Sequence, residues 1–152
     1  MNRRWATALI FGAGVVAVLV FFGWVTGPPT PHDYRTDAQK AASGSLSAVR
    51  TVVLAGRADL AGKLLDPYLT TTLDDATDSA RTTQSNLAGQ SPPDAASRSL
   101  RDQVAPMLGA AVAGIGDVAV AADSGDDADL SAALDRLAAL GDKLDAFLTS
   151  SQ

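Results

Sequence analysis

W-A-T-A-L-I-F-G-A-G-V-V-A-V-L-V-F-F-G-W-V, residues 5–25, is the stretch that decides how this chain is organised. It contains no charged residue. As an α-helix it would be roughly 31 Å long, about the thickness of the hydrocarbon core of a bilayer. The apolar run is also longer than that of a typical signal peptide. We therefore predict an uncleaved N-terminal transmembrane helix over residues 5–25, with a cleaved signal peptide and a buried core helix as less favoured alternatives.

Residues at the two ends of this stretch predict its orientation. Arg3 and Arg4 precede it, whereas the flank that follows carries no Lys or Arg. Cytoplasmic flanks of membrane spans carry the excess of basic residues. Trp5 and Trp24 lie one at each end, where indole rings prefer the membrane interface. Residues 1–4 are therefore predicted to be a cytoplasmic tip, which makes the chain a single-pass protein of the cell membrane with its C-terminal part outside the cytoplasm.

The rest of the chain divides into a spacer and a domain. Residues 26–32, T-G-P-P-T-P-H, are rich in proline and cannot continue a helix, so we predict an extended spacer. Residues 33–152 suffice for one ordinary domain with its own core. The sequence has no cysteine, so disulfides cannot stabilise this domain. The net charge of −5 argues against nucleic-acid binding and against peripheral attachment to anionic lipid, both of which require a basic surface.

Apolar residues from about position 33 onward recur at intervals of three and four, which is typical of amphipathic helices, and no strand pattern occurs. Gly56 is expected to close the first helix. The segment G-Q-S-P-P, residues 89–93, separates the second helix from the third, which Ser91 or Asp94 can cap. An aspartate-rich loop, residues 123–129, precedes the fourth helix.

Four amphipathic helices joined by short loops favour antiparallel neighbours. The predicted fold is therefore all-α, in which the N-terminal transmembrane helix is followed by an extracytoplasmic antiparallel up-down four-helix bundle, residues 33–152. The alternative is a pair of helical hairpins that needs a second chain to complete the bundle, because the aromatic content is low and the helix seams are rich in alanine.

Two prolines fall within the predicted helices, Pro67 in the second and Pro106 in the third. A proline frees the carbonyl group one turn before it, so both residues are candidates for helix kinks that open a small polar pocket. At Pro67 there is an alternative, in which Asp66 caps a new helix and Pro67 occupies its first turn. The apolar stripe continues in phase across this point, which favours one long helix that is kinked or broken at Pro67.

The sequence offers no convincing catalytic, cofactor-binding or metal-binding group. His32 is the only histidine and is expected to be a solvated spacer residue. No nucleophile elbow, P-loop or dinucleotide fingerprint occurs. The densest acidic cluster does not follow the spacing of a calcium loop, so we expect helix capping there rather than calcium binding. That cluster consists of Asp123, Asp126, Asp127 and Asp129.

The segments L-L-D-P-Y-L, residues 64–69, and L-A-A-L-G-D-K-L, residues 137–144, occur here behind an Arg-Arg pair, one span and a proline-rich exit. This layout resembles small single-pass membrane proteins of high-GC Gram-positive bacteria. The resemblance covers the whole chain, rests on composition and layout, and implies no activity. The predicted bundle is also similar in architecture to the ligand-binding domains of bacterial chemoreceptors, which differ in having two spans and a large cytoplasmic output.

These observations lead to one functional expectation and an alternative. We expect a membrane-anchored, non-enzymatic interaction or accessory module of the cell envelope. Its partners would be the lipid bilayer, through residues 5–25, and an envelope protein or a second copy of the chain. The alternative is a small-ligand-sensing ectodomain that signals through a partner membrane protein. A calcium- or metal-dependent hydrolase is the least favoured reading.

Overall fold

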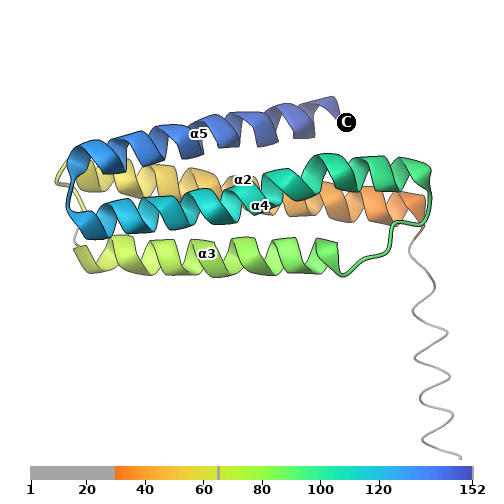
Figure 1. The fold of residues 1–152 in the computed structure, drawn as a ribbon, viewed down its shortest axis with the longest axis horizontal. Helices are drawn as coiled ribbons and strands as arrows, with labels where there is room; N and C mark the ends of the chain where they lie inside the picture. The colour runs from red at the N-terminus through yellow and green to blue at the C-terminus, as the bar shows by residue number, and fades with distance from the viewer. Residues whose placement is uncertain (1–29, 65, 152) are drawn as a thin grey trace, which may run out of the picture.

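The structure is a computed structural model that describes residues 30–64 and 66–151 (Figure 1). The predicted span and the orienting residues Arg3, Arg4, Trp5 and Trp24 lie outside the described residues. The described part is all-helical and contains no strand, which confirms the all-α prediction for these residues. Its four helices are α2 (Pro31–Leu60), α3 (Asp66–Ala88), α4 (Ala95–Ser124) and α5 (Asp127–Ser150).

The helices lie lengthwise beside one another, and successive helices are joined at alternate ends (Figure 1). α2 and α4 contact each other and both remaining helices, whereas α3 and α5 have no contact within the described residues. α2 and α4 therefore form the centre of the unit, with α3 and α5 on opposite sides. We call the end where α2 and α4 begin the proximal end, and the end with the turns after α2 and α4 the distal end.

α2 begins two residues earlier than predicted, because Thr30 and Asp33 form a capping box around its first turn. The Asp33 backbone N–H donates to Thr30 Oγ1 at 3.2 Å, and the Thr30 N–H donates to Asp33 Oδ2 at 3.2 Å. Pro31 is well suited to this first turn, since it lacks the N–H that a helix start would leave unpaired. His32 consequently lies in the first turn of α2, and its expected place in an extended spacer was wrong.

The predicted end of the first helix at Gly56 was also wrong. α2 continues to Leu60, and Gly56 is buried where α2 meets α5. A Cβ atom at Gly56 would lie 2.6 Å from Leu134 Cδ2, so the Leu134 side chain would have to move if residue 56 carried a side chain. The turn after α2 instead uses Gly62, whose φ of +65° lies in the left-handed region that favours glycine.

The two prolines behave differently. The long second helix that was predicted to be kinked or broken at Pro67 is broken there, because α3 begins at Asp66 and Pro67 lies in its first turn. Pro106 lies inside α4, which continues through it from Ala95 to Ser124. The solvent-exposed position of Pro106 leaves the core face of α4 intact.

The core consists of two clusters of apolar side chains. The larger one runs along all four helices and includes Val49, Ile115 and Leu134. The smaller one lies near the proximal end, around Tyr34 and Leu108. Many of the buried positions are alanines, which suits the close approach of helices.

Among the described helices, α4 alone has the length and apolar composition that a membrane span would need. It lies in the middle of the chain rather than at the N-terminus. One face of α4, including Val104, Leu108 and Ile115, is buried against the other helices. The central helix of a packed helical unit has the same composition, so this property does not assign α4 to a membrane.

Candidate interaction surface

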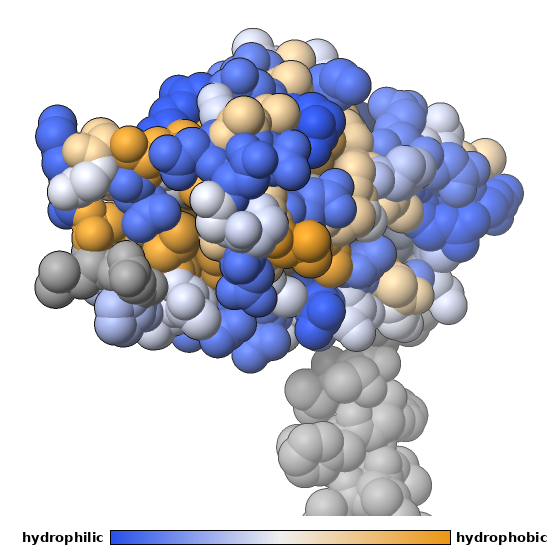
Figure 2. All heavy atoms as spheres, turned by 60° about the vertical axis from the view of Figure 1, so that its left-hand side comes forward, coloured by the Kyte–Doolittle hydropathy of each residue, from blue (hydrophilic) through white to orange (hydrophobic). Residues whose placement is uncertain are grey.

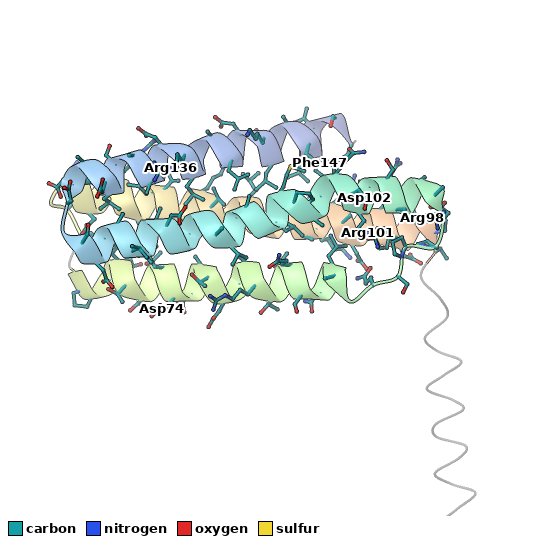
Figure 3. The ribbon with its side chains drawn as sticks, viewed as in Figure 1. Asp74, Arg98, Arg101, Asp102, Arg136 and Phe147 are labelled. Atoms are coloured by element: carbon teal, nitrogen blue, oxygen red, sulfur yellow. The ribbon has the colours of Figure 1, made fainter. Side chains whose placement is uncertain are left out.

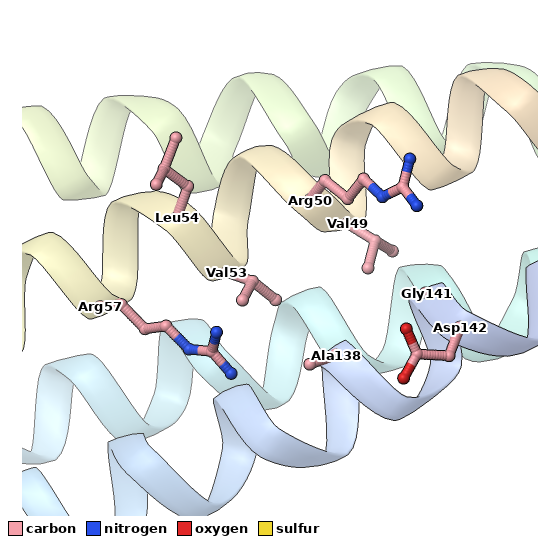
Figure 4. Close-up of a pocket in the computed structure, with 8 residues that line it drawn as sticks. All are labelled: Val49, Arg50, Val53, Leu54, Arg57, Ala138, Gly141 and Asp142. Carbon is pink, nitrogen blue, oxygen red and sulfur yellow. The ribbon is translucent and has the colours of Figure 1, made fainter. Parts of the chain in front are cut away.

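A groove with a mostly apolar lining lies between α2 and α5 (Figure 4). Its floor is formed by Val49 and Val53 of α2 and by Ala138 and Gly141 of α5. The groove forms because these two α5 residues are small, and a Cβ atom at Gly141 would lie 3.3 Å from Val49 Cγ1. Its volume of about 210 Å³ offers room for one bulky apolar side chain.

Charged side chains stand on both sides of this groove. Arg50 Nη2 lies 3.2 Å from Asp145 Oδ1, and Arg57 Nη2 lies 3.6 Å from Asp135 Oδ1. Asp142 adds a third carboxylate on the α5 side. Both ion pairs are more than half exposed, so each stabilises the fold by at most about 1 kcal/mol. Their main effect is to give the groove a basic α2 wall and an acidic α5 wall.

Leu54 stands on the rim of the groove and is 73% exposed. A second shallow recess on the outer face of α2 shares Arg50 and Leu54 with the groove and is floored by Ser43 and Ser47. One exposed leucine is ordinary on a protein surface. An exposed leucine flanked by two recesses, one of them apolar, is typical of a surface that contacts another protein.

The structure does not bring the two predicted kink residues together. Pro67 lies at the distal end of α3, whereas Pro106 lies in the proximal half of α4. Next to Pro106 in sequence, Ala105 lines a small recess between α3 and α4 of about 200 Å³. Gln84 and Arg101 are its polar lining residues. Ala105 rather than Pro106 lines this recess, so a pocket opened by the two prolines stays a prediction.

Aspartate side chains cap two helix N-termini, as the sequence predicted. Asp94 Oδ1 accepts from the Ser97 N–H at 2.7 Å at the start of α4. Asp126 Oδ1 accepts from the N–H groups of Ala128 at 2.8 Å and Asp129 at 3.2 Å. α5 therefore starts at Asp127, and the loop before it is shorter than predicted. Within the described residues, no cluster of three potential metal ligands occurs.

Substitutions of Asp126, the N-cap residue of α5, distinguish a capping role from calcium binding. Asp126→Ala should lower the free energy of unfolding by about 1 kcal/mol, whereas Asp126→Asn, which keeps an acceptor oxygen, should be nearly neutral. The measurement is thermal unfolding of the full-length chain in detergent with and without calcium. Asp127→Ala is the matched control, since this carboxylate accepts no capping bond. A calcium-dependent rise in melting temperature that Asp126→Asn abolishes would contradict the capping role.

The capping carboxylates also predict loss of stability in acid. Hydrogen bonds from Thr30 lower the pKa of Asp33, and hydrogen bonds from Ser97 lower the pKa of Asp94. Because both pKa values are lower in the folded chain than in the unfolded one, this stability is present above about pH 4 and is lost as the pH falls through the folded values. Melting temperatures of Asp94→Asn should fall less steeply below pH 4 than those of the natural chain. Equal slopes would contradict this origin.

Tyr34 is a buried residue for which we predicted no role from the sequence. Its side chain is fully buried, and its hydroxyl group has no hydrogen-bond partner among the residues that the structure describes. Burial raises the pKa of this hydroxyl; the charge of Arg101 lowers it by a smaller amount, and that of Asp102 adds a small further rise. The spacing of Tyr34 with Ala38 and Ala42 on one helix face is the signal that could have placed it in the core.

The charge of the surface differs between the two ends. Arg98 and Arg101 lie near the proximal end, and Asp74 lies near the distal end (Figure 3). Figure 2, in which the distal end is turned forward, shows mostly hydrophilic side chains with apolar atoms between them. The residues flanking the distal turns are largely acidic and include Asp59, Asp123, Asp126, Asp127 and Asp129.

Comparisons with known proteins find no matching family model, no matching curated protein and no matching solved structure. The interpretation of the groove therefore rests on its own geometry and chemistry.

Proposed function

We propose that this chain is a membrane-anchored, non-enzymatic interaction module of the cell envelope. Residues 5–25 would hold it as a single-pass span, with Arg3 and Arg4 in the cytoplasm and the four helices outside. The helices would form an antiparallel up-down bundle that closes within one chain. In support of this topology, each helix packs against the next in sequence, and α5 packs against α2.

The observation that carries the proposal is the α2–α5 groove. It combines an apolar floor with oppositely charged walls, and exposed Leu54 stands at its rim. Interaction hot spots are apolar pockets of this kind, surrounded by polar groups that fix orientation. His32, the only histidine of the sequence, lies exposed in the first turn of α2 rather than in the groove. The groove therefore supports binding better than acid–base catalysis.

Site-specific photo-crosslinking in living cells tests this role. A photoreactive amino acid would replace Leu54 in the full-length chain, followed by detergent extraction and mass spectrometry. Val120 on α4 is the matched control, because both side chains are 73% exposed. We expect one stoichiometric crosslinked partner from position 54, either another envelope protein or a second copy, and none from position 120. Equal or absent crosslinking at the two positions would overturn the groove as the interaction surface.

The recess between α3 and α4 supports ligand sensing as a second candidate function. Arg101 and Gln84 stand beside the apolar side chains of Leu87 and Leu108, which would suit a small carboxylate with an apolar tail. Decanoate, at concentrations below its micelle-forming range, should then raise the melting temperature of the full-length chain, and Arg101→Gln should remove the rise. An unchanged melting temperature would count against this candidate.

A further inference from the structure

A recess of about 560 Å³ lies at the proximal end, where the start of α2, the start of α4 and the end of α5 meet. It is distinct from the α2–α5 groove and shares no lining residue with it. Its polar lining includes His32 and Arg35 from α2 and Ser97, Ser99 and Gln103 from α4. Hydrogen-bond donors thus reach this recess from two helices.

The charge of this recess is opposite to that of the chain. The sequence contains 17 acidic residues and has a net charge of −5, yet no acidic side chain is among the described residues that line the recess. The nearby carboxylates of Asp33 and Asp94 accept hydrogen bonds from the backbone N–H groups of Thr30 and Ser97. Arg35 takes part in none of the ion pairs formed among the described residues. The positive ends of the α2 and α4 helix dipoles also lie at this end, where the negative end of the α5 dipole partly offsets them.

We propose that this recess binds a phosphate group, and that its ligand is the headgroup of an anionic phospholipid. Arg35 supplies a guanidinium group that can hold two phosphate oxygens, and the hydroxyl groups of Ser97 and Ser99 can donate to the others. Leu100 and Phe147 supply the apolar wall that a glycerol backbone needs. The recess would thus fix the helical unit on the membrane surface, an activity that goes beyond the protein contact proposed for the groove.

The position of the recess in the chain favours a lipid over a free anion. Pro31 lines it and is the first residue of α2, six positions after the predicted span ends at Val25. Six extended residues reach roughly 20 Å at most. If residues 5–25 span the bilayer, the recess therefore lies within reach of the lipid headgroups. Free phosphate shares the same chemistry, so the experiment must separate the two sources.

The test uses the full-length chain in a neutral detergent with an affinity tag that lacks histidine. His32 is the only histidine, so its imidazole proton signals in NMR spectra report on this recess alone. The probes are dihexanoylphosphatidylglycerol, dihexanoylphosphatidylcholine and inorganic phosphate. We expect saturable shifts of the His32 signals with phosphatidylglycerol, and much weaker binding of phosphatidylcholine because its choline cation offsets the phosphate charge. Loss of one charge-assisted contact in Arg35→Gln should raise the Kd roughly tenfold.

Arg81→Gln is the charge-matched control, since Arg81 is exposed on α3 and does not line the recess. It should leave the Kd unchanged. Saturation by inorganic phosphate at equal affinity, with the same sensitivity to Arg35→Gln, would support the phosphate site but overturn the lipid as its ligand. Absence of saturable shifts with every probe, or equal weakening by both substitutions, would overturn the proposal. Neither result depends on the groove, so the proposed protein contact would stand or fall separately.

Discussion

Replacing Tyr34 with alanine is expected to lower the free energy of unfolding by about 3–5 kcal/mol, whereas replacing it with phenylalanine is expected to raise it by about 1 kcal/mol. Tyr34 has no exposed surface and packs among Ala38, Leu87, Val104 and Leu108. Removing the ring would leave a large cavity. Removing only the hydroxyl group would eliminate a buried polar atom that has no hydrogen-bond partner within residues 30–64 and 66–151.

Tyr34→Phe is also expected to differ from the natural chain in its stability at high pH. Because burial raises the pKa of Tyr34 in the folded chain, the unfolded chain releases this proton first as the pH rises past about 10. The stability that this group contributes is therefore present below pH 10 and is lost above it. Melting temperatures measured from pH 8 to pH 11 should fall more steeply for the natural chain than for Tyr34→Phe. A phenylalanine variant that is less stable at pH 7 would show that the hydroxyl group has a bonding partner.

Leu134→Ala is expected to lower the free energy of unfolding by about 3 kcal/mol, because this side chain is 1% exposed and fills the contact between α2 and α5. Its neighbour Gly56 makes a sharper test possible. A Cβ atom at Gly56 would lie 2.6 Å and 2.9 Å from the two Leu134 methyl carbons. Gly56→Ala should therefore destabilise the chain by about 1–2 kcal/mol despite the better helix propensity of alanine.

Combining the two substitutions tests whether this contact is the cause. In the double variant the new methyl group meets the space that Leu134→Ala vacates, so the combined loss should be smaller than the sum of the single losses by about 1 kcal/mol or more. Gly116→Ala is the control, because a Cβ atom there meets no atom within 4 Å. It should stabilise the chain by about 0.5–1 kcal/mol. Additive losses, or destabilisation by Gly116→Ala, would contradict the close approach seen at Gly56.

Much of the helical architecture follows from local chemistry in the sequence. Intervals of three and four between apolar residues indicate helices wherever they occur, and the break before α4 and the caps Asp94 and Asp126 lie where the sequence predicted them. These signals are local because a helix forms its hydrogen bonds within four residues. The start of α2 at Pro31 could have been predicted on the same basis, since Thr30 and Asp33 have the spacing of a capping box.

Residues with two possible roles could not be assigned from the sequence. A glycine at this point commonly ends a helix. Gly56 instead lies where α2 and α5 approach closely, because Leu134 of α5 packs directly over it. A proline such as Pro67 can kink a helix or lie in the first turn of one. The break between α2 and α3 shows that Pro67 lies in the first turn of α3. In both cases the deciding neighbour belongs to the tertiary arrangement rather than to the local segment.

The sequence by itself determined the helical periodicity, two of the caps, the acidic character of the chain and the uncharged stretch of residues 5–25. Only the tertiary structure decided which surfaces these helices present. The groove between Val53 and Gly141, the burial of Tyr34 and the recess beside Arg35 each join residues from helices far apart in sequence. Helix formation depends on neighbours within one turn, whereas a groove or recess depends on which side chains from separate helices are small enough to leave space between them.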